Sequence, residues 1–181
     1  GQGGKVDTVV IMGSGEPLMN YDHVLGFIRL LHEDYVLGMG YRNITLSTSG
    51  IVPQMYQLAD EGLPISLSVS LHAPHQELRT ELMPISRKYP MEEVIKAARH
   101  YADVTKRRVT YEYILIDHVN DGEEQARELV SLMRGQLASV NLIPINPVAE
   151  RHLLRPSAAR IDWFEHYLTT HHVNVTVRRE M

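Results

Sequence analysis

Short apolar, β-branched runs alternate along the chain with segments in which apolar residues recur every three or four positions. The runs predict strands, and the longer spacing predicts amphipathic helices. Six strands are expected, at Val6–Met12, Asn43–Thr48, Pro64–Leu71, Arg108–Ile116, Val140–Ile145 and Val173–Val177. Five helices are expected between them, at 20–38, Pro53–Glu61, Met91–Thr105, Gly122–Arg134 and Ser157–Thr170. This alternation is typical of a parallel sheet with right-handed crossovers, so the predicted fold class is α/β.

Small polar side chains occupy one face of several predicted strands. The third strand shows this most clearly, because Ser66, Ser68, Ser70 and His72 alternate with apolar residues. The same alternation places Thr45 and Ser47 on one face of the second strand, and Thr110 and Glu112 on one face of the fourth. In a single strand such hydroxyls could simply bond local backbone. An open sheet and part of a barrel are both compatible with the alternation. Three strands together favour the partial barrel, curved around a polar lumen.

The carboxyl ends of the predicted strands carry most of the candidate chemistry. In parallel βα folds ligands bind at these ends. Two glycines at the first strand end, Gly13 and Gly15, would let a ligand approach the backbone closely. Glu16 follows with a carboxylate suited to an ammonium or hydroxyl donor, although a tight turn would also explain it. His72 and Asn146 follow the third and fifth strands and can each donate or accept hydrogen bonds.

Two other interpretations of these strand ends are disfavoured by spacing. A dinucleotide fingerprint needs a third glycine, but Leu18 stands in its place and Pro17 intrudes. The His72–His75 segment could suggest a metal site, but the chain has no helical histidine pair at i and i+4 with an acid between.

Several other residues have both a structural and a functional interpretation. Glu112 lies in an apolar run. It could be an ion-paired core residue or a ligand contact, and we favour the structural role. Asn120 suits a turn. Clusters of basic residues could together form a rim that contacts phosphates, at 87–88, 106–108, 151/155 and 178–179.

Composition limits the chemistry of the chain. Its 181 residues suit a single domain, 1–181, and include 44% hydrophobic and 22% charged residues. The net charge of −4 argues against binding nucleic acid by bulk charge alone. The absence of cysteine excludes disulfides, thiolate zinc sites and an iron–sulfur cluster held by this chain's own thiolates. No apolar stretch approaches the roughly 20 residues that span a membrane, and we expect a cytoplasmic location.

The strand-end segments, taken in order, resemble the radical-SAM RNA methyltransferases that modify adenosine C2, the RlmN branch of the RlmN/Cfr family. The matching segments are VVIMGSGEPLMNYDHV, ITLSTSGIVP, SLHAPHQELRTELMPISRKYP, RVTYEYILIDHVNDG, VNLIPINPV and VNVTVRRE. They extend over essentially the whole chain. The resemblance implies a partial (βα)6 radical-SAM barrel, of which this chain is a truncated core without the first βα unit.

The resemblance also implies contacts with S-adenosylmethionine. Gly15 and Glu16 match the segment that binds the amino acid moiety of the cofactor. Ser47 matches the serine of the LSTSG motif, and Asn146 matches the last asparagine of the NLIPxN motif. The SLHAP motif contributes three further contacts, from Ser70, Leu71 and His72. Ser14 departs mildly from the family pattern, in which methionine is usual between the two glycines.

Three family elements are expected outside these residues. They are the CxxxCxxC triad that binds the [4Fe-4S] cluster, the cysteine that carries the transferred methyl group, and a small amino-terminal domain that helps to hold RNA. In the intact enzyme the resemblance implies a methylated cysteine, a 5′-deoxyadenosyl radical and a covalent protein–RNA intermediate. It also implies 23S rRNA and tRNA adenosines as substrates, and a reductant such as flavodoxin or ferredoxin. We expect this chain to supply the cofactor pocket and to be inactive alone.

Two alternatives to this function belong to other classes. One is a complete, cluster-free module that binds an adenosyl ligand in the same pocket. The other is a metal-free barrel lyase or aldolase, which is disfavoured because no lysine on the lumen face is evident for a Schiff base. The first predicted strand would form an exposed edge, through which the chain could self-associate.

Overall fold

The computed structural model describes residues 4–12 and 14–179, and its strands form a single parallel sheet. The sheet contains six strands in sequential order, β1 to β6. Their bounds are Val9–Ile11 for β1, Ile44–Thr48 for β2, Ser66–Ser70 for β3, Val109–Leu115 for β4, Ala138–Pro144 for β5 and Val175–Val177 for β6. The predicted α/β class with parallel strands is therefore confirmed.

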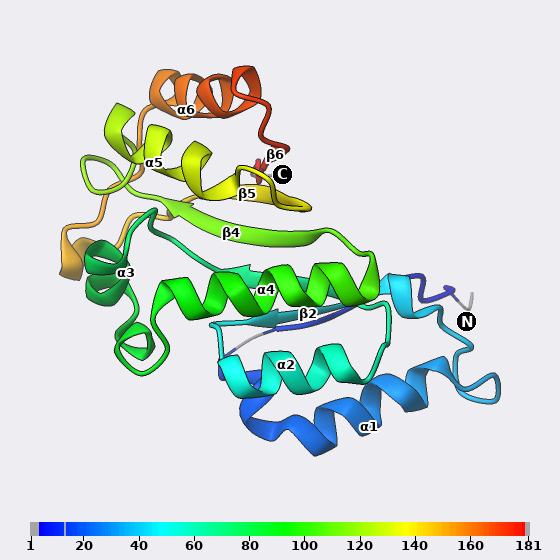
Figure 1. The fold of residues 1–181 in the computed structure, drawn as a ribbon. Helices are drawn as coiled ribbons and strands as arrows, with labels where there is room; N and C mark the ends of the chain where they lie inside the picture. The colour runs from blue at the N-terminus through cyan, green and yellow to red at the C-terminus, as the bar shows by residue number, and fades with distance from the viewer. Residues whose placement is uncertain (1–3, 13, 180–181) are drawn as a thin grey trace.

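Helices connect successive strands and cover one face of the sheet (Figure 1). They are α1 at Tyr21–His32, α2 at Val52–Asp60, α3 at Gln76–Leu82, α4 at Met91–Thr105, α5 at Glu123–Met133 and α6 at Ala158–Thr170. Short 3₁₀ turns lie at Pro17–Asn20, Tyr41–Asn43, Pro84–Arg87 and Ala149–Arg151. Five of the helices match the predicted ones to within a few residues, although α1 ends at His32 rather than near Gly38. The residue pattern does not predict α3, because its seven residues are too few to show an apolar period.

The predicted polar face is present in the sheet register. Ser47 pairs with Ser68, Ser68 with Thr110, and Thr110 with Ser139. One layer nearer the carboxyl ends, Ser70 pairs with Glu112 and Glu112 with Asn141. The intervening residues point to the other face and are buried against the helices, among them Leu46, Leu67, Tyr111 and Leu142. The polar side chains thus line the side of the sheet that the long helices leave uncovered.

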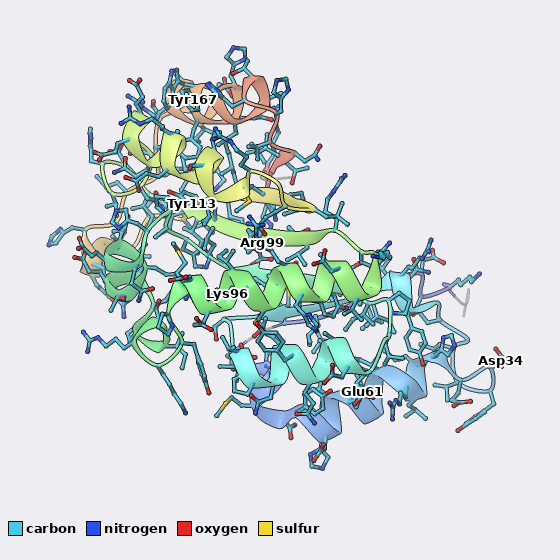
Figure 2. All side chains as sticks on the ribbon, viewed as in Figure 1. Asp34, Glu61, Lys96, Arg99, Tyr113 and Tyr167 are labelled. Atoms are coloured by element: carbon cyan, nitrogen blue, oxygen red, sulfur yellow. The ribbon has the colours of Figure 1, made fainter. Side chains whose placement is uncertain are left out.

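Three buried tyrosines show how the core satisfies its polar atoms. The hydroxyl of Tyr101 donates to the carbonyl of Ile65 at 2.7 Å, and that of Tyr111 donates to Gln136 at 2.7 Å. Tyr113 of β4, labelled in Figure 2, stacks its ring on Phe164 of α6 with centroids 5.7 Å apart. Burial raises the pKa of all three phenols, so they remain neutral hydrogen-bond donors.

The two edge strands are shorter than predicted. β1 contains Val9–Ile11 rather than Val6–Met12, and β6 contains Val175–Val177 rather than Val173–Val177. Each edge strand pairs with one neighbour among the described residues, so fewer backbone hydrogen bonds hold its ends. Val10, which is in register with Thr45 on the uncovered face, and Met12 are exposed. Gly13, which the sequence analysis singled out, lies outside the described residues.

A membrane-spanning helix was not expected from the sequence. None of the helices in residues 4–12 and 14–179 is both long and apolar enough to cross a bilayer.

Candidate cofactor site at the carboxyl ends of the strands

The predicted site residues all lie at the carboxyl ends of the strands or just beyond them. Gly15 and Glu16 follow β1, Ser47 is in β2, and Ser70 ends β3, with Leu71 and His72 directly after it. Asn146 lies beyond the end of β5 and is exposed. Gly15 has a φ of +138°, which only glycine adopts readily, and a Cβ there would meet no atom within 4 Å. Ser14, Gly15 and Glu16 contribute to a shallow depression of about 410 Å³ at this end of β1.

The carboxylate of Glu16 connects the loop after β1 to the loop after β2. One oxygen accepts hydrogen bonds from the Thr48 hydroxyl at 2.9 Å, the Ser49 amide at 2.6 Å and the Ser49 hydroxyl at 2.9 Å. The other oxygen accepts from the amide of Leu18 at 2.7 Å, which caps the 3₁₀ turn at Pro17–Asn20. The sequence predicted a carboxylate suited to hydroxyl donors, and these donors come from the chain itself. Glu16 therefore fixes the shape of the site rather than presenting an unengaged carboxylate.

Arg79 connects the loop after β2 to the end of β3. It is a fully buried residue of α3, and its guanidinium donates to the carbonyls of Ser49 at 2.8 Å and Ser70 at 2.9 Å, and to the Ser86 hydroxyl at 3.1 Å. Its Nε is buried without a hydrogen-bond partner. Desolvation lowers the pKa of Arg79 to about 10, so the side chain still carries its charge at neutral pH. The residue pattern does not predict this role, because an arginine between Glu77 and Glu81 suggests a solvated helix.

Three hydrogen bonds hold His72 where the chain leaves β3. Its amide donates to the carbonyl of Glu112 at 3.2 Å, and its carbonyl accepts from the Asn120 side chain at 2.9 Å. Its ring Nδ1 faces the amide of Ile114 at 3.0 Å. The backbone of His72 has a φ of +59°, an uncommon conformation for a residue with a Cβ. Desolvation, helped by the positive charge of Arg79, lowers its pKa to about 4.

Glu112 lies on the polar face of the sheet, between Ser70 and Asn141 in the strand register. It is half-buried there. Burial raises its pKa, and the positive charge of Arg178 partly opposes this. This position allows a ligand contact as well as the structural role that the sequence favoured.

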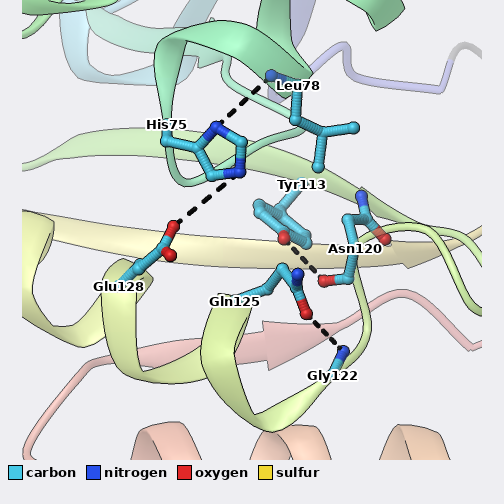
Figure 3. A network of polar contacts seen from close by, with 7 residues as sticks. All are labelled: His75, Leu78, Tyr113, Asn120, Gly122, Gln125 and Glu128. Carbon is cyan, nitrogen blue, oxygen red and sulfur yellow. Dashed lines mark hydrogen bonds and ion pairs between the residues drawn. The ribbon is translucent and has the colours of Figure 1, made fainter.

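The histidines of the His72–His75 segment use their Nδ1 atoms to hold the backbone. The Nδ1 of His75 accepts from the amide of Leu78 at 3.3 Å and caps α3, while its Nε2 lies 4.0 Å from Glu128 (Figure 3). Within the part of the chain that the structure describes, no group of three His, Cys, Asp or Glu residues could hold a metal ion. Both histidines therefore bond to backbone amides through Nδ1.

Comparison with known proteins agrees with this arrangement of polar strand ends. Residues 3–130 match the family model described as "Radical SAM superfamily". The chain belongs to the radical SAM superfamily.

Two bacterial proteins named "Probable dual-specificity RNA methyltransferase RlmN" are similar to this radical SAM chain over nearly all its length. The one from Symbiobacterium thermophilum is 59% identical over 99% of the chain, and the one from Thermoanaerobacter sp. is 49% identical over 98%. The matches cover 49% and 52% of those proteins, so the chain spans about half the length of the curated relatives it matches. The resemblance to the RlmN branch is thus confirmed.

Solved structures support the fold as well. A radical SAM methyltransferase from Sphaerobacter thermophilus superposes with a TM-score of 0.92 at 47% identity, over 96% of this chain and 51% of that one. A domain of pyruvate-formate lyase-activating enzyme from Bacteroides vulgatus has a TM-score of 0.69 at 17% identity, over 98% of this chain and 100% of that one. The second likeness concerns the fold alone.

The radical SAM superfamily uses S-adenosylmethionine and a [4Fe-4S] cluster. The residues of this chain suit S-adenosylmethionine but not the cluster. The open backbone at Gly15, the hydroxyls of the polar face and the ring of His72 offer the donors and acceptors that an amino acid joined to a nucleoside needs. The cluster needs thiolates, and the chain contains no cysteine. Its ligands are therefore absent from these residues.

Proposed function

We propose that this chain forms the S-adenosylmethionine-binding part of an RNA methyltransferase that modifies adenosine C2. The observation that carries the proposal is the 59% identity, over 99% of the chain, to a protein named as a dual-specificity RNA methyltransferase. The ordered polar strand ends support it independently. Substrates would be adenosines of 23S rRNA and tRNA, and the intact enzyme would take electrons from a reductant such as flavodoxin or ferredoxin.

The residues of this chain would bind and orient the cofactor. S-adenosylmethionine supplies the methyl and adenosyl groups when it is bound. The segment of Gly15 and Glu16 would line the position of its amino acid moiety, and Ser47, Ser70, Leu71, His72 and Asn146 would line the remainder. Because the carboxylate of Glu16 is already bonded to Thr48, Ser49 and Leu18, it would act by holding this segment in shape.

The other parts of the reaction would come from outside these 181 residues. The cluster and the methyl-carrying thiol both need cysteine, of which the chain has none. We therefore propose that the chain alone is inactive and that its cofactor site works within a larger protein. Sequencing the parent gene tests this proposal, which requires a CxxxCxxC motif before the segment and a cysteine after it.

Calorimetric titration of the chain with S-adenosylmethionine tests the cofactor site. We expect weak binding, because the cluster normally ligates the amino and carboxylate groups of the cofactor. Glu16→Ala should abolish the residual heat, whereas Glu165→Ala, at a residue on α6, should leave it unchanged. Equal binding by the wild-type chain and Glu16→Ala would refute the assignment of this segment. Anaerobic reconstitution with iron and sulfide should give no cluster absorbance.

The absence of cysteine equally favours a second candidate, a cluster-free module that binds an adenosyl ligand. This second function predicts the same calorimetric result, but it predicts different sequence before this segment in the gene. A native start codon at the beginning of this segment, with no cysteine motif before it, would favour the module.

A further inference from the structure

The protonation pattern of the His72 ring is set by a backbone group. Its Nδ1 lies 3.0 Å from the amide nitrogen of Ile114. A backbone amide can only donate, so Nδ1 must be the acceptor in this contact. The proton of the neutral ring then has to lie on Nε2. Nε2 is therefore a donor.

Asn120 bonds to both residues of this contact, His72 and Ile114. It is fully buried, and its side-chain nitrogen donates to the carbonyls of His72 at 2.9 Å and Ile114 at 2.6 Å. Its side-chain oxygen accepts from the amide of Ile116 at 2.8 Å. The carbonyl of Asn120 in turn accepts from the hydroxyl of Tyr113 at 2.7 Å (Figure 3). The loop after β3 and the end of β4 are thus joined through one side chain.

The three side-chain contacts of Asn120 require an amide at this position. Two of its side-chain contacts are to carbonyl oxygens and need a donor, while the third is to an amide and needs an acceptor. Asparagine supplies both, and an ionised aspartate supplies acceptors only. The turn role considered for Asn120 from sequence accounts for none of the contacts to His72 or Ile114.

We propose that Asn120 is a positioning residue that presents His72 as a fixed Nε2–H donor, so that the cofactor atom facing His72 is a hydrogen-bond acceptor. The proposal rests on the cofactor site proposed above. Suitable acceptors are a ring nitrogen of adenine, a ribose oxygen or a carboxylate oxygen. The cofactor's ammonium group is excluded as the partner because it has no lone pair to offer.

Nitrogen NMR of the histidine side chains tests the first part of the proposal without any ligand. In the wild-type chain, the His72 ring should show the shifts of the neutral Nε2–H tautomer at pH 7. The Nδ1–H tautomer would overturn the proposal. Asn120→Asp should abolish the single-tautomer pattern, whereas Asn174→Asp, the same change at an exposed residue before β6, should preserve it. An unchanged pattern in Asn120→Asp would also overturn it. If Asn120→Asp does not fold, the wild-type ring remains the deciding measurement.

Titration with separate halves of the cofactor tests the second part. Adenosine should shift the His72 Nε2–H resonance if the acceptor belongs to the nucleoside, and methionine should shift it if the acceptor is the carboxylate. For S-adenosylmethionine, His72→Leu should raise the Kd about tenfold, and His72→Gln, which keeps an N–H donor, should recover part of the loss. Equal affinity of wild type and His72→Leu would overturn the acceptor assignment. Absence of any binding by the wild-type chain would instead contradict the proposed cofactor site while leaving the tautomer result valid.

Discussion

The backbone of Ser49 lies between two opposite charges. The carboxylate of Glu16 accepts from its amide at 2.6 Å, and the guanidinium of Arg79 donates to its carbonyl at 2.8 Å. Since Arg79 also contacts the carbonyl of Ser70, the ends of three strands share one hydrogen-bonded chain. Charge-assisted bonds are stronger than neutral ones, and their geometry is fixed. The site is thus shaped by residues that need not touch a ligand.

Replacing Arg79 tests this connection. Arg79→Met leaves the carbonyls of Ser49 and Ser70 without a donor, so we expect the free energy of unfolding to fall by about 2–4 kcal/mol. The pKa of His72 should rise because a repelling positive charge is lost, although burial still holds it below 6.5. Denaturant melts and an NMR titration of His72 measure the two effects. An unchanged His72 pKa in a folded variant would contradict the proposed proximity of the two charges.

The lowered pKa of His72 predicts a pH dependence of stability. Between about pH 6.5 and 4 the unfolded chain binds a proton at this ring and the folded chain does not. Stability from this group is therefore complete above pH 6.5 and decreases as the pH falls toward 4, by an amount on the order of 2 kcal/mol. Urea melts at pH 7 and 4.5 should show a larger loss for wild type than for His72→Gln. Equal losses would show that burial of this ring has no energetic consequence.

At the scale of elements, the loop between β2 and α2 is fixed by a glycine. Gly50 has a φ of +105°, and a Cβ there would lie 2.8 Å from Val94 Cγ2 of α4 and 3.5 Å from Arg79 Nη2. Both backbone conformation and packing therefore exclude a side chain. The guanidinium of Arg79, which donates to the neighbouring Ser49 carbonyl, lies beside this glycine.

Gly50→Ala should therefore destabilise the protein. Backbone strain and overpacking against Val94 together predict a loss of about 2–4 kcal/mol in the free energy of unfolding. Gly26→Ala, at an α1 position where a Cβ meets nothing within 4 Å, is the matched control and should be neutral or stabilising. Thermal or urea denaturation of both variants measures the difference. Equal stability of the two would show that the loop relaxes at little cost.

The sequence predicted the elements better than the contacts between them. Period-two alternation identified the strands and the polar face, because each strand repeats the same signal. The alternation could not identify the roles of Arg79 and Asn120, because their hydrogen-bond partners are mainly backbone carbonyls and amides of other segments. Such partners have no side-chain signature in sequence. Motif resemblance supplied the proposed site residues, and the structure shows that the carboxylate of Glu16 bonds to partners within the chain.

At the scale of the molecule, β1 presents a free edge among the described residues. It pairs with β2 alone, and Val10 and Met12 beside that edge are exposed. Unpaired strand edges are templates for pairing with another chain. We therefore expect the isolated chain to self-associate with increasing concentration.

Sedimentation velocity over a range of concentrations measures this association. Val10→Lys should weaken it, because a charged residue on an edge strand opposes pairing. Val104→Lys changes another exposed valine, on α4, and should have no effect. A wild-type chain that remains monomeric at every concentration would rule out the edge as an interface.

The sequential order of the strands has a consequence for how the protein forms. Each of β2 to β5 pairs with the strand before it and the strand after it, and β1 and β6 pair with one neighbour each. Among the described residues, no strand inserts between two earlier ones. During synthesis on the ribosome, each βα unit after the first meets a strand edge that has already been made. Contacts between neighbouring βα units also span fewer residues along the chain than a rearranged strand order would require. The sheet can therefore grow from β1 to β6 in the order of translation.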